Sequence, residues 1–468
     1  MKYANKGTKL NPIYAIVAGI TICISLFILT TSKPYLAMAP GLGLIFFFLI
    51  SRNLELGYFA IIFLLPFAAY RNLGGIEYLR MHWILAFSIV FVIALQMISN
   101  KHRKLDLKSR LWLWLLPYFS VSLVVSMYSE YPQEALKNVV LQAVAYLFIA
   151  LGMILVTEKG YSRTLPKVLI TSISAGSLSA AIGFFFNVTW FAEKVDGGFK
   201  RGLGVTTDPN SLSMMVLFVM PFLAYMFISQ KHPGKRLLAL LLVLINLLGL
   251  VTTYSRGGVL LLIMLVAAIG FTYMHLMSAR YVGLIMALIG FIVVGAISVI
   301  PPSYWERQVS LVSIGKKDIS LKRRASYLIV GWERFVDNPV FGSGTGVFKK
   351  YYAESKIADK MVRPGRNRER PAHNTYLEVL VGGGLLSLFL FLGALGQALL
   401  NFNHAIRKFI AAGKNDMVMI TRTYRMSFVV LSLFLFLFSD LFQKYLLVSF
   451  AMSQVALRLS QNSDEAEI

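Results

Sequence analysis

The chain alternates between long apolar runs and short polar, mostly basic connections. Each apolar run is close to the roughly 20 residues that a helix needs to cross a bilayer. The runs fall at 13–31, 34–51, 54–70, 81–98, 111–127, 137–156, 167–187, 210–229, 237–254, 257–277, 281–300, 376–400, 423–439 and 441–457. The first and last pairs are closely spaced, so the pattern predicts an all-α, polytopic transmembrane helical bundle with about twelve to fourteen spans.

The composition agrees with a membrane protein and narrows its chemistry. Hydrophobic residues make up 57% of the chain, and the mean hydropathy is +0.66. The single cysteine, Cys23, excludes disulfides within the chain and thiolate metal clusters. The net charge of +24 would suit nucleic acid, but the basic residues are spread over both faces of the expected bundle. They are better suited to setting topology and contacting membrane lipids.

Basic residues in the short connections predict which side each connection faces. With the N-terminus in the cytoplasm, the connections expected inside carry five, three, three and four Lys or Arg. These connections are 99–110, 158–167, 230–236 and 401–422. Two short connections on the opposite side, "TSKP" and "YSEYPQEALK", carry one each. The alternation places 188–209, 254–258 and 301–375 on the outer face.

The long segment 301–375 is the one large part expected outside the membrane. It holds fifteen Lys or Arg against seven Asp or Glu, and its pattern predicts short amphipathic helices broken at Asn338-Pro339 and at a glycine turn. We therefore expect N-terminal transmembrane helices over 1–300, an extracytoplasmic and partly helical loop over 301–375, C-terminal transmembrane helices over 376–458, and a disordered cytoplasmic tail over 459–468.

The first candidate motif on the outer face is "FKRGLGVTTDPNSLSMM". Lys200 and Arg201 are expected in a loop, and Asp208-Pro209-Asn210 predicts a helix start with Asp as cap and Pro at the first helical position. The structural interpretation is a loop followed by a capped helix. The functional one is an anion site, since an arginine and a helix N-terminus both favour phosphate.

The second motif is "TTYSRGGVLL", in a very short turn between two apolar runs. Arg256 at a membrane boundary can simply extend its charge to the head groups. Ser255 and the two glycines allow close backbone approach, which favours a guanidinium that points into a cavity. The glycines of "FGSGTGVF" have no strand before them, so they do not predict a nucleotide loop.

The third motif, "RPAHNTYLEVL", places a histidine where a basic segment meets an apolar run. Of six histidines, only His82 and His373 fall on the expected outer face. A lone histidine is most often structural, but His373 follows Arg363, Arg366, Arg368 and Arg370. A neutral imidazole is a competent general base near pH 7, and surrounding cations would keep it neutral.

These three motifs, in this order and spacing over about residues 200–390, resemble the O-antigen ligase and O-antigen polymerase superfamily of bacterial membrane glycosyltransferases. The resemblance implies a GT-C-like helical fold, with His373 catalytic and with Arg201 and Arg256 binding the donor diphosphate. Supporting candidates are Lys200, Asp208, Asn210, Ser255, Arg370, Asn374 and Tyr376. The chain departs from the family at Gly382 in "VGGG", where an acidic residue is common.

The resemblance also implies a reaction. The donor would be a glycan on a polyprenyl (undecaprenyl) diphosphate, and the acceptor a hydroxyl of a lipid A-core sugar or of another glycan. Transfer would proceed with inversion, without a metal or other cofactor, on the periplasmic face of the bacterial inner membrane. Repeat-unit polymerisation by the same chemistry, a transporter or flippase for lipid-linked sugars, and Asp208 in place of His373 as the base remain alternatives.

Overall fold

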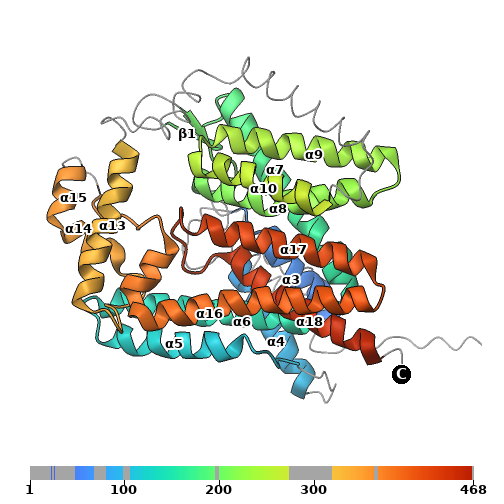
Figure 1. The fold of residues 1–468 in the computed structure, drawn as a ribbon, viewed down its shortest axis with the longest axis horizontal. Coiled ribbons are helices and arrows are strands. Elements are labelled where there is room, and N and C mark those ends of the chain that lie inside the picture. Colours follow the sequence, from blue (N-terminus) through green and yellow to red (C-terminus); the bar gives the residue numbers. More distant parts are fainter. Residues whose placement is uncertain are drawn as a thin grey trace, which may run out of the picture. The chain divides into compact units, whose positions relative to one another are not determined.

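The computed structural model describes residues 48–67, 81–98, 106–194, 200–273, 319–362 and 367–465, together with Cys23 and Leu26. These parts of the chain are almost entirely helical, which confirms the all-α prediction (Figure 1). The chain divides into two compact units, residues 1–64 with 70–104 and residues 65–69 with 105–468. The described helices of the first unit are α3 (Leu54–Phe63) and α4 (Met81–Ile98).

The second unit contains the remaining described elements. The helices of its first half are α5 (Trp112–Met127), α6 (Pro132–Leu155), the π-helical turn η4 (Gly160–Thr164), α7 (Leu165–Phe185), α8 (Pro209–Ser229), α9 (Pro233–Thr252) and α10 (Arg256–Tyr273). Those of its second half are α13 (Ile319–Asp337), α14 (Phe348–Glu354), α15 (Lys356–Met361), α16 (Thr375–Ala411), α17 (Asn415–Phe434) and α18 (Lys444–Glu465). A short antiparallel hairpin pairs β1 (Ala192–Lys194) with β2 (Lys200–Gly202).

Seven of the described helices are long and apolar enough to cross a membrane, so the chain is a multi-pass membrane protein. They are α6, α7 together with η4, α8, α9, α10, α16 and α17. Helices α3 and α5 and most of α4 are apolar but shorter. The predicted spans at 13–31, 34–51 and 281–300 lie wholly or almost wholly outside the described residues.

The membrane helices of the second unit pack as two groups joined by α17. Helix α16 packs against α18 and α5, and α6 packs against α5 and α18. Helix α8 packs against α7 and α9 in the other group (Figure 1). Helix α17 contacts both α8 and α16, so it connects the group that carries the first two motifs to the group that carries the third.

Two segments expected to be irregular are helical. The connection predicted at 401–422 is mostly helix, because α16 continues to Ala411 and α17 begins at Asn415. Gly413, with φ +65°, makes the reversal between them, and it is the position where a residue without Cβ is favoured. The predicted disordered tail 459–468 begins as helix, since α18 runs to Glu465. Arg458 secures this end by donating to the carbonyls of Met153 and Val156.

Helices α13, α14 and α15 form a small lobe with its own core. Tyr327 and Val330 of α13 pack with Phe348 and Tyr351 of α14 and with Leu377 of α16. All five side chains are buried, so the first two turns of α16 belong to the lobe as much as to the membrane bundle. The predicted break at Asn338-Pro339 is confirmed, since α13 ends at Asp337.

The lobe is tied to the connection between α5 and α6. Ser129 Oγ donates to the carbonyl of Ser343 at 2.7 Å, and Asn138 Nδ2 donates to the carbonyl of Thr345 at 3.2 Å. Lys349 Nζ forms an ion pair with Glu134 Oε1 at 2.8 Å. These three contacts, one to the α5–α6 connection and two to α6, fix the orientation of the lobe relative to this group of spans.

The glycines of "FGSGTGVF" dock on the glycines of "VGGG". Helix α16 is broken at Gly383 and Gly384, where the backbone leaves helical φ and ψ values. The backbone groups that lose helical partners there bond instead to residues 339–344. These bonds are Ser343 N to Val381 O, Gly344 N to Gly382 O and Leu385 N to Pro339 O, each 2.9 Å, and Leu386 N to Val340 O, 3.3 Å. The departure from the family pattern at Gly382 therefore lies where the lobe joins a membrane helix.

Candidate active site

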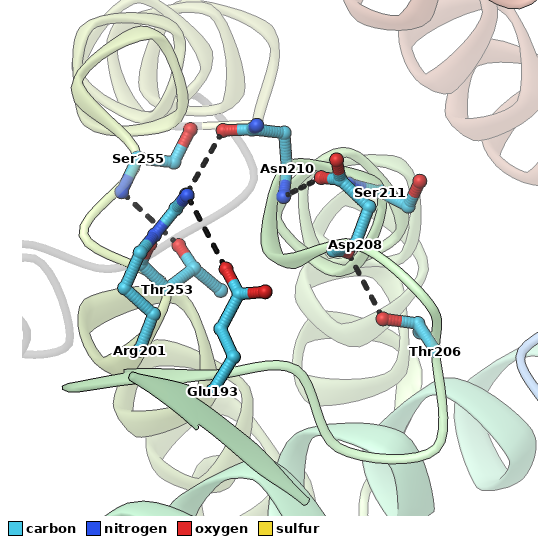
Figure 2. Close-up of polar contacts among 8 residues, drawn as sticks. All are labelled: Glu193, Arg201, Thr206, Asp208, Asn210, Ser211, Thr253 and Ser255. Atoms are coloured by element: carbon cyan, nitrogen blue, oxygen red, sulfur yellow. Dashed lines mark hydrogen bonds and ion pairs between the residues drawn. The ribbon is translucent and has the colours of Figure 1, made fainter. Parts of the chain in front are cut away.

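Arg201 connects the hairpin to both helix starts of the first two motifs (Figure 2). It lies in β2 opposite Glu193, so the expected loop is a strand at this position. Its Nε donates to the carbonyl of Thr253 at 2.7 Å, and its Nη2 donates to Asn210 Oδ1 at 3.3 Å. Its Nη1 lies 3.7 Å from Glu193 Oε1. The guanidinium thus holds α8 and the α9–α10 turn together.

Burial sets the electrostatic character of Arg201. Only 11% of its side chain is exposed, and burial lowers the pKa of the guanidinium, while the carboxylates of Asp208 and Glu193 raise it. Burial also raises the pKa of Glu193 against the opposing effect of Arg201. An arginine has five N–H groups, and the contacts above use three of them.

Asp208 caps α8 as the sequence predicts. Its Oδ1 accepts from the backbone N–H groups of Asn210, at 2.5 Å, and of Ser211, at 3.3 Å, and Pro209 takes the first helical position (Figure 2). Aspartate is favoured here because it satisfies N–H groups that have no partner inside the helix. This capping fixes the carboxylate at a helix N-terminus beside Arg201.

The second motif forms the turn between α9 and α10, as predicted. Tyr254 has φ +53°, and Ser255 Oγ accepts from the N–H of Gly258, which closes the first turn of α10. Arg256 is the first residue of α10 and is half-buried. Because Arg201 Nε bonds to Thr253, three residues earlier, the structure brings the first and second motifs together.

Lys200 does not join this cluster. Its Nζ donates to Asn187 Oδ1 and lies 5.0 Å from the centroid of the Phe184 ring. Neighbouring residues of a strand point to opposite faces, so Lys200 and Arg201 diverge. The structure therefore gives Lys200 a role in holding the hairpin to the end of α7.

His373 is held in an unusual backbone conformation immediately before α16. Its φ is +50°, in the left-handed region, which costs about 1–2 kcal/mol for a residue with a Cβ. Both neighbours are fixed: Ala372 N–H donates to Glu378 Oε1 at 3.0 Å, and Asn374 N–H donates to Ser439 Oγ at 3.1 Å. The imidazole packs beside the ring of Tyr327, with centroids 5.8 Å apart.

The surroundings of His373 keep it neutral. Burial, and after it Arg324, Arg370 and Arg323 in that order of effect, lowers the pKa of the imidazole to about 4. Asp208 acts in the opposite direction and raises this pKa. Since Asp208 also raises the pKa of Arg201, one carboxylate interacts electrostatically with both the histidine of the third motif and the arginine of the first.

Two supporting candidates have structural roles at the start of α16. Asn374 is the N-cap, and its side chain accepts from the N–H of Leu377 at 3.1 Å. Tyr376 points to α17, where its hydroxyl donates to the carbonyl of Ser432 at 2.8 Å and its ring stacks on Phe436. Arg370, by contrast, is one of the arginines that act on His373. Arg363 and Arg366 lie outside the described residues.

Sequence reasoning missed the connection between α17 and α18. Thr375 N–H bonds to the carbonyls of Leu435 and Phe438, and Asp440 N–H bonds to Thr375 Oγ1. Gln443 Nε2 lies 3.2 Å from both Asp440 Oδ2 and Met214 Sδ of α8. This segment therefore spans from the start of α16 to α8. Its signal in the sequence is the polar pair Ser439-Asp440 inside a very apolar stretch.

Arg323, Arg324 and Tyr327 were also missed. They lie on α13, and no pattern in the sequence indicates that this helix faces His373. Among the described residues, no group of three His, Cys, Asp or Glu side chains is placed to hold a metal ion.

The comparison with known proteins covers the last two motifs. A family model described as O-antigen ligase matches residues 240–392. This segment includes Arg256 and His373, whereas Arg201 and Asp208 precede it. No curated protein matches the chain. The resemblance noted from the motifs is thus confirmed: over residues 240–392 this chain carries the domain of the O-antigen ligase family, within the O-antigen ligase and polymerase superfamily.

Proposed function

We propose that the protein is a membrane glycosyltransferase of the O-antigen ligase type. It transfers a glycan from a polyprenyl diphosphate to an acceptor hydroxyl on the periplasmic face of the bacterial inner membrane. The acceptor is a lipid A-core sugar or another glycan. Support comes from the family match, from the seven described membrane helices and from the chemistry of the three motifs.

One observation carries the proposal. Asp208 raises the pKa of both Arg201 and His373, and Arg201 donates to Thr253 in the turn that leads into Arg256. Cationic groups suited to a diphosphate are thereby associated with an imidazole that is neutral at pH 7. A leaving-group site and a proton acceptor are the two requirements of glycosyl transfer.

The reaction follows from these roles. The acceptor hydroxyl gives its proton to the imidazole of His373 as its oxygen bonds to the anomeric carbon. The bond from that carbon to the diphosphate oxygen breaks, and its electron pair leaves on the polyprenyl diphosphate. The guanidinium groups of Arg201 and Arg256 stabilise the charge that grows there, without requiring a metal ion. A single displacement of this kind inverts the anomeric configuration.

The geometry favours His373 over Asp208 as the base. Asp208 Oδ1 already accepts two backbone N–H groups as a helix cap, so this oxygen is engaged in holding the start of α8. His373 lies in the strained conformation that is often found at functional sites. Bound diphosphate would offset the nearby arginines and raise the pKa of the imidazole, which makes it a better base when the donor is present.

Purified protein, a lipid-linked glycan and separate acceptors test this function. A conjugate to the lipid A-core supports ligation, and a ladder of repeat units supports polymerisation by the same chemistry. If neither product forms, but the lipid-linked glycan crosses the membrane of vesicles that contain the protein, the protein is a transporter and the proposal is wrong.

A further inference from the structure

The inner face of α13 carries polar groups that have no partner. Tyr327 is only 1% exposed, and its hydroxyl makes no hydrogen bond among the described residues. The same is true of Nε of Arg323, one helical turn before it, and of Nε of Arg370. Buried donors without acceptors destabilise a protein, and each such group calls for an explanation.

These three residues are neighbours around His373. The Tyr327 ring lies beside the imidazole, and Arg323 and Arg370 both act on the pKa of Tyr327 as well as on that of His373. Within the described parts of the chain, neither arginine forms an ion pair with a carboxylate. The result is a group of buried donor atoms on Tyr327 and on two half-buried arginines that have no carboxylate partner in the described parts of the chain.

We propose that Arg323, Arg370 and Tyr327 form an oxyanion-binding site beside His373, which holds a phosphate or carboxylate group of the acceptor glycan. This inference rests on the proposed function, in which Arg201 and Arg256 hold the donor diphosphate. An anion held next to the base would orient the acceptor so that a nearby hydroxyl faces the imidazole. A guanidinium matches such groups with paired N–H donors, and a phenol adds a third.

The first test needs no transfer activity. Inorganic phosphate should raise the thermal midpoint of the full chain in detergent, because a ligand that binds only the folded state stabilises it. Arg323→Gln and Arg370→Gln should each weaken phosphate binding about 10- to 100-fold, and Tyr327→Phe less. Lys322→Gln, an exposed neighbour of Arg323, is the matched control and should bind phosphate like the wild type.

Transfer kinetics then identify the source of the anion. With a phosphorylated acceptor, Arg323→Gln should raise the acceptor KM, and with the same acceptor after dephosphorylation it should not. If Arg323→Gln instead weakens donor binding at an unchanged acceptor KM, the site exists but holds the donor diphosphate. The site is refuted if phosphate binding is the same in Arg323→Gln, Arg370→Gln and Lys322→Gln. A protein that binds phosphate as expected but transfers no glycan refutes only the proposed function.

The opposite face of α13 supports a separate inference. Leu328, Ile329, Trp332 and Val336 recur at the helical period and are 53%, 51%, 61% and 58% exposed. A continuous exposed apolar stripe of this kind is uncommon on a surface that faces water only. Tyr327 and Val330, on the other side of the helix, are buried in the lobe.

The end of the stripe lies near exposed apolar side chains of a membrane helix. After α13, the carbonyls of Pro339 and Val340 accept from the N–H groups of Leu385 and Leu386 of α16. Leu385 is 53% exposed on that apolar helix. The end of α13 therefore lies level with the part of α16 where lipid-facing side chains begin. Lys322, exposed near its other end, carries charge that complements anionic head groups.

We infer that α13 lies in the membrane–water interface, with this stripe among the lipid head groups and upper acyl chains. Tryptophan is the side chain most typical of that zone. One face of α13 would then contact lipid while the other contacts His373, which sets the height of the histidine relative to the head groups.

Fluorescence quenching in nanodiscs tests the depth of the stripe. In a Cys23→Ala background, an environment-sensitive fluorophore is attached to Leu328→Cys, Trp332→Cys or Val336→Cys, with Lys356→Cys and Lys360→Cys on α15 as exposed controls. The stripe positions should be quenched by lipids with a nitroxide near the head group and should resist aqueous iodide, and the controls should show the reverse. Equal iodide quenching at both sets of positions, or protection of the stripe from both quenchers, would show that lipid does not cover it.

Discussion

At the scale of single residues, backbone strain falls beside the three motifs. Among the described residues, the non-glycine residues with positive φ are Asn187, Tyr254 and His373. The first holds Lys200, the second precedes Ser255, and the third is the candidate base. Such conformations persist only where surrounding contacts enforce them, and they concentrate at functional sites. This distribution supports the choice of motifs independently of the family match.

The pH dependence of transfer should report His373. A protonated imidazole cannot accept a proton, so the rate should rise with pH through the pKa of the group that acts as base. For kcat/KM, which reports the free enzyme, this limb should lie near the value of about 4 set by burial and by the arginines. For kcat it should lie higher, because the bound diphosphate offsets the positive charges.

Arg324→Gln provides the control for that profile. Arg324 is the first of the arginines that lower the pKa of His373, so its removal should move the acidic limb of kcat/KM to higher pH. If the acidic limb of kcat/KM stays at the same pH in Arg324→Gln, the group that titrates there is not His373.

Arg256 should contribute to transfer by binding the diphosphate of the donor. Arg256→Ala should weaken donor binding and reduce the rate by about 10²–10³-fold, because a guanidinium interacts with diphosphate in both the ground and transition states. Arg256→Lys should restore only part of this, since an ammonium cannot copy the paired N–H donors. Binding titrations and single-turnover rates measure the two effects separately. Normal donor binding by Arg256→Ala would leave this arginine without its proposed role.

For the candidate site, the sequence predicted the local conformations correctly. Asp208 follows from the Asp-Pro signature of a helix start, and the Ser255–Arg256 turn follows from its position between two apolar runs. Arg323 and Tyr327 were not predictable, because their proximity to His373 depends on how α13 packs against the start of α16. The structural roles of Tyr376 and Lys200 likewise depend on neighbours that are distant in the chain.

At the scale of elements, hydropathy predicted most helices but not the break in α16. The run 376–400 is uniformly apolar, so its pattern predicts an unbroken helix. It does not indicate that backbone groups near Gly383 and Gly384 bond to residues 339–344 instead of to their own helix. The three consecutive glycines were the available signal, since glycine is favoured where another backbone approaches closely. The same close approach explains the glycines of "FGSGTGVF".

Two glycines of α16 provide a matched pair of variants. At Gly384, with φ +64°, an added Cβ would lie 2.2 Å from the carbonyl oxygen of Val340. Gly384→Ala should therefore destabilise the protein by at least about 2 kcal/mol and loosen the lobe. At Gly396, nothing lies within 4 Å of an added Cβ, so Gly396→Ala should be neutral or stabilising by up to about 1 kcal/mol. Unfolding in detergent with a denaturant measures both, and equal stabilities would contradict the docking of the two glycine segments.

For the whole molecule, the sequence correctly predicted a membrane protein. It did not predict the full length of several helices. Window hydropathy finds apolar runs, but α16 and α17 continue as helix into the polar segment 401–422. Polar residues alone do not end a helix; a capping residue or a glycine does. Between α16 and α17 the reversal is made by Gly413. The sides of the membrane rest on the distribution of basic residues and remain a prediction.

Labelling of single cysteines tests those sides. In a Cys23→Ala background, Ser320→Cys and Lys360→Cys should react with an impermeant thiol reagent in intact spheroplasts, because the alternation of basic loops places the lobe outside. Lys414→Cys, in the turn between α16 and α17, should react only after lysis. The reverse pattern would put the lobe in the cytoplasm and rule out a periplasmic site.

The most direct test of the central claim is the single-turnover transfer rate of His373→Asn, with donor binding measured on the same sample. Asparagine tolerates positive φ better than alanine, so this variant should fold like the wild type and separate chemistry from strain. If His373 is the base, the rate should fall about 10²–10⁴-fold while donor binding is retained. Near-normal turnover by His373→Asn, together with loss of turnover by Asp208→Asn, would contradict the account and make Asp208 the base.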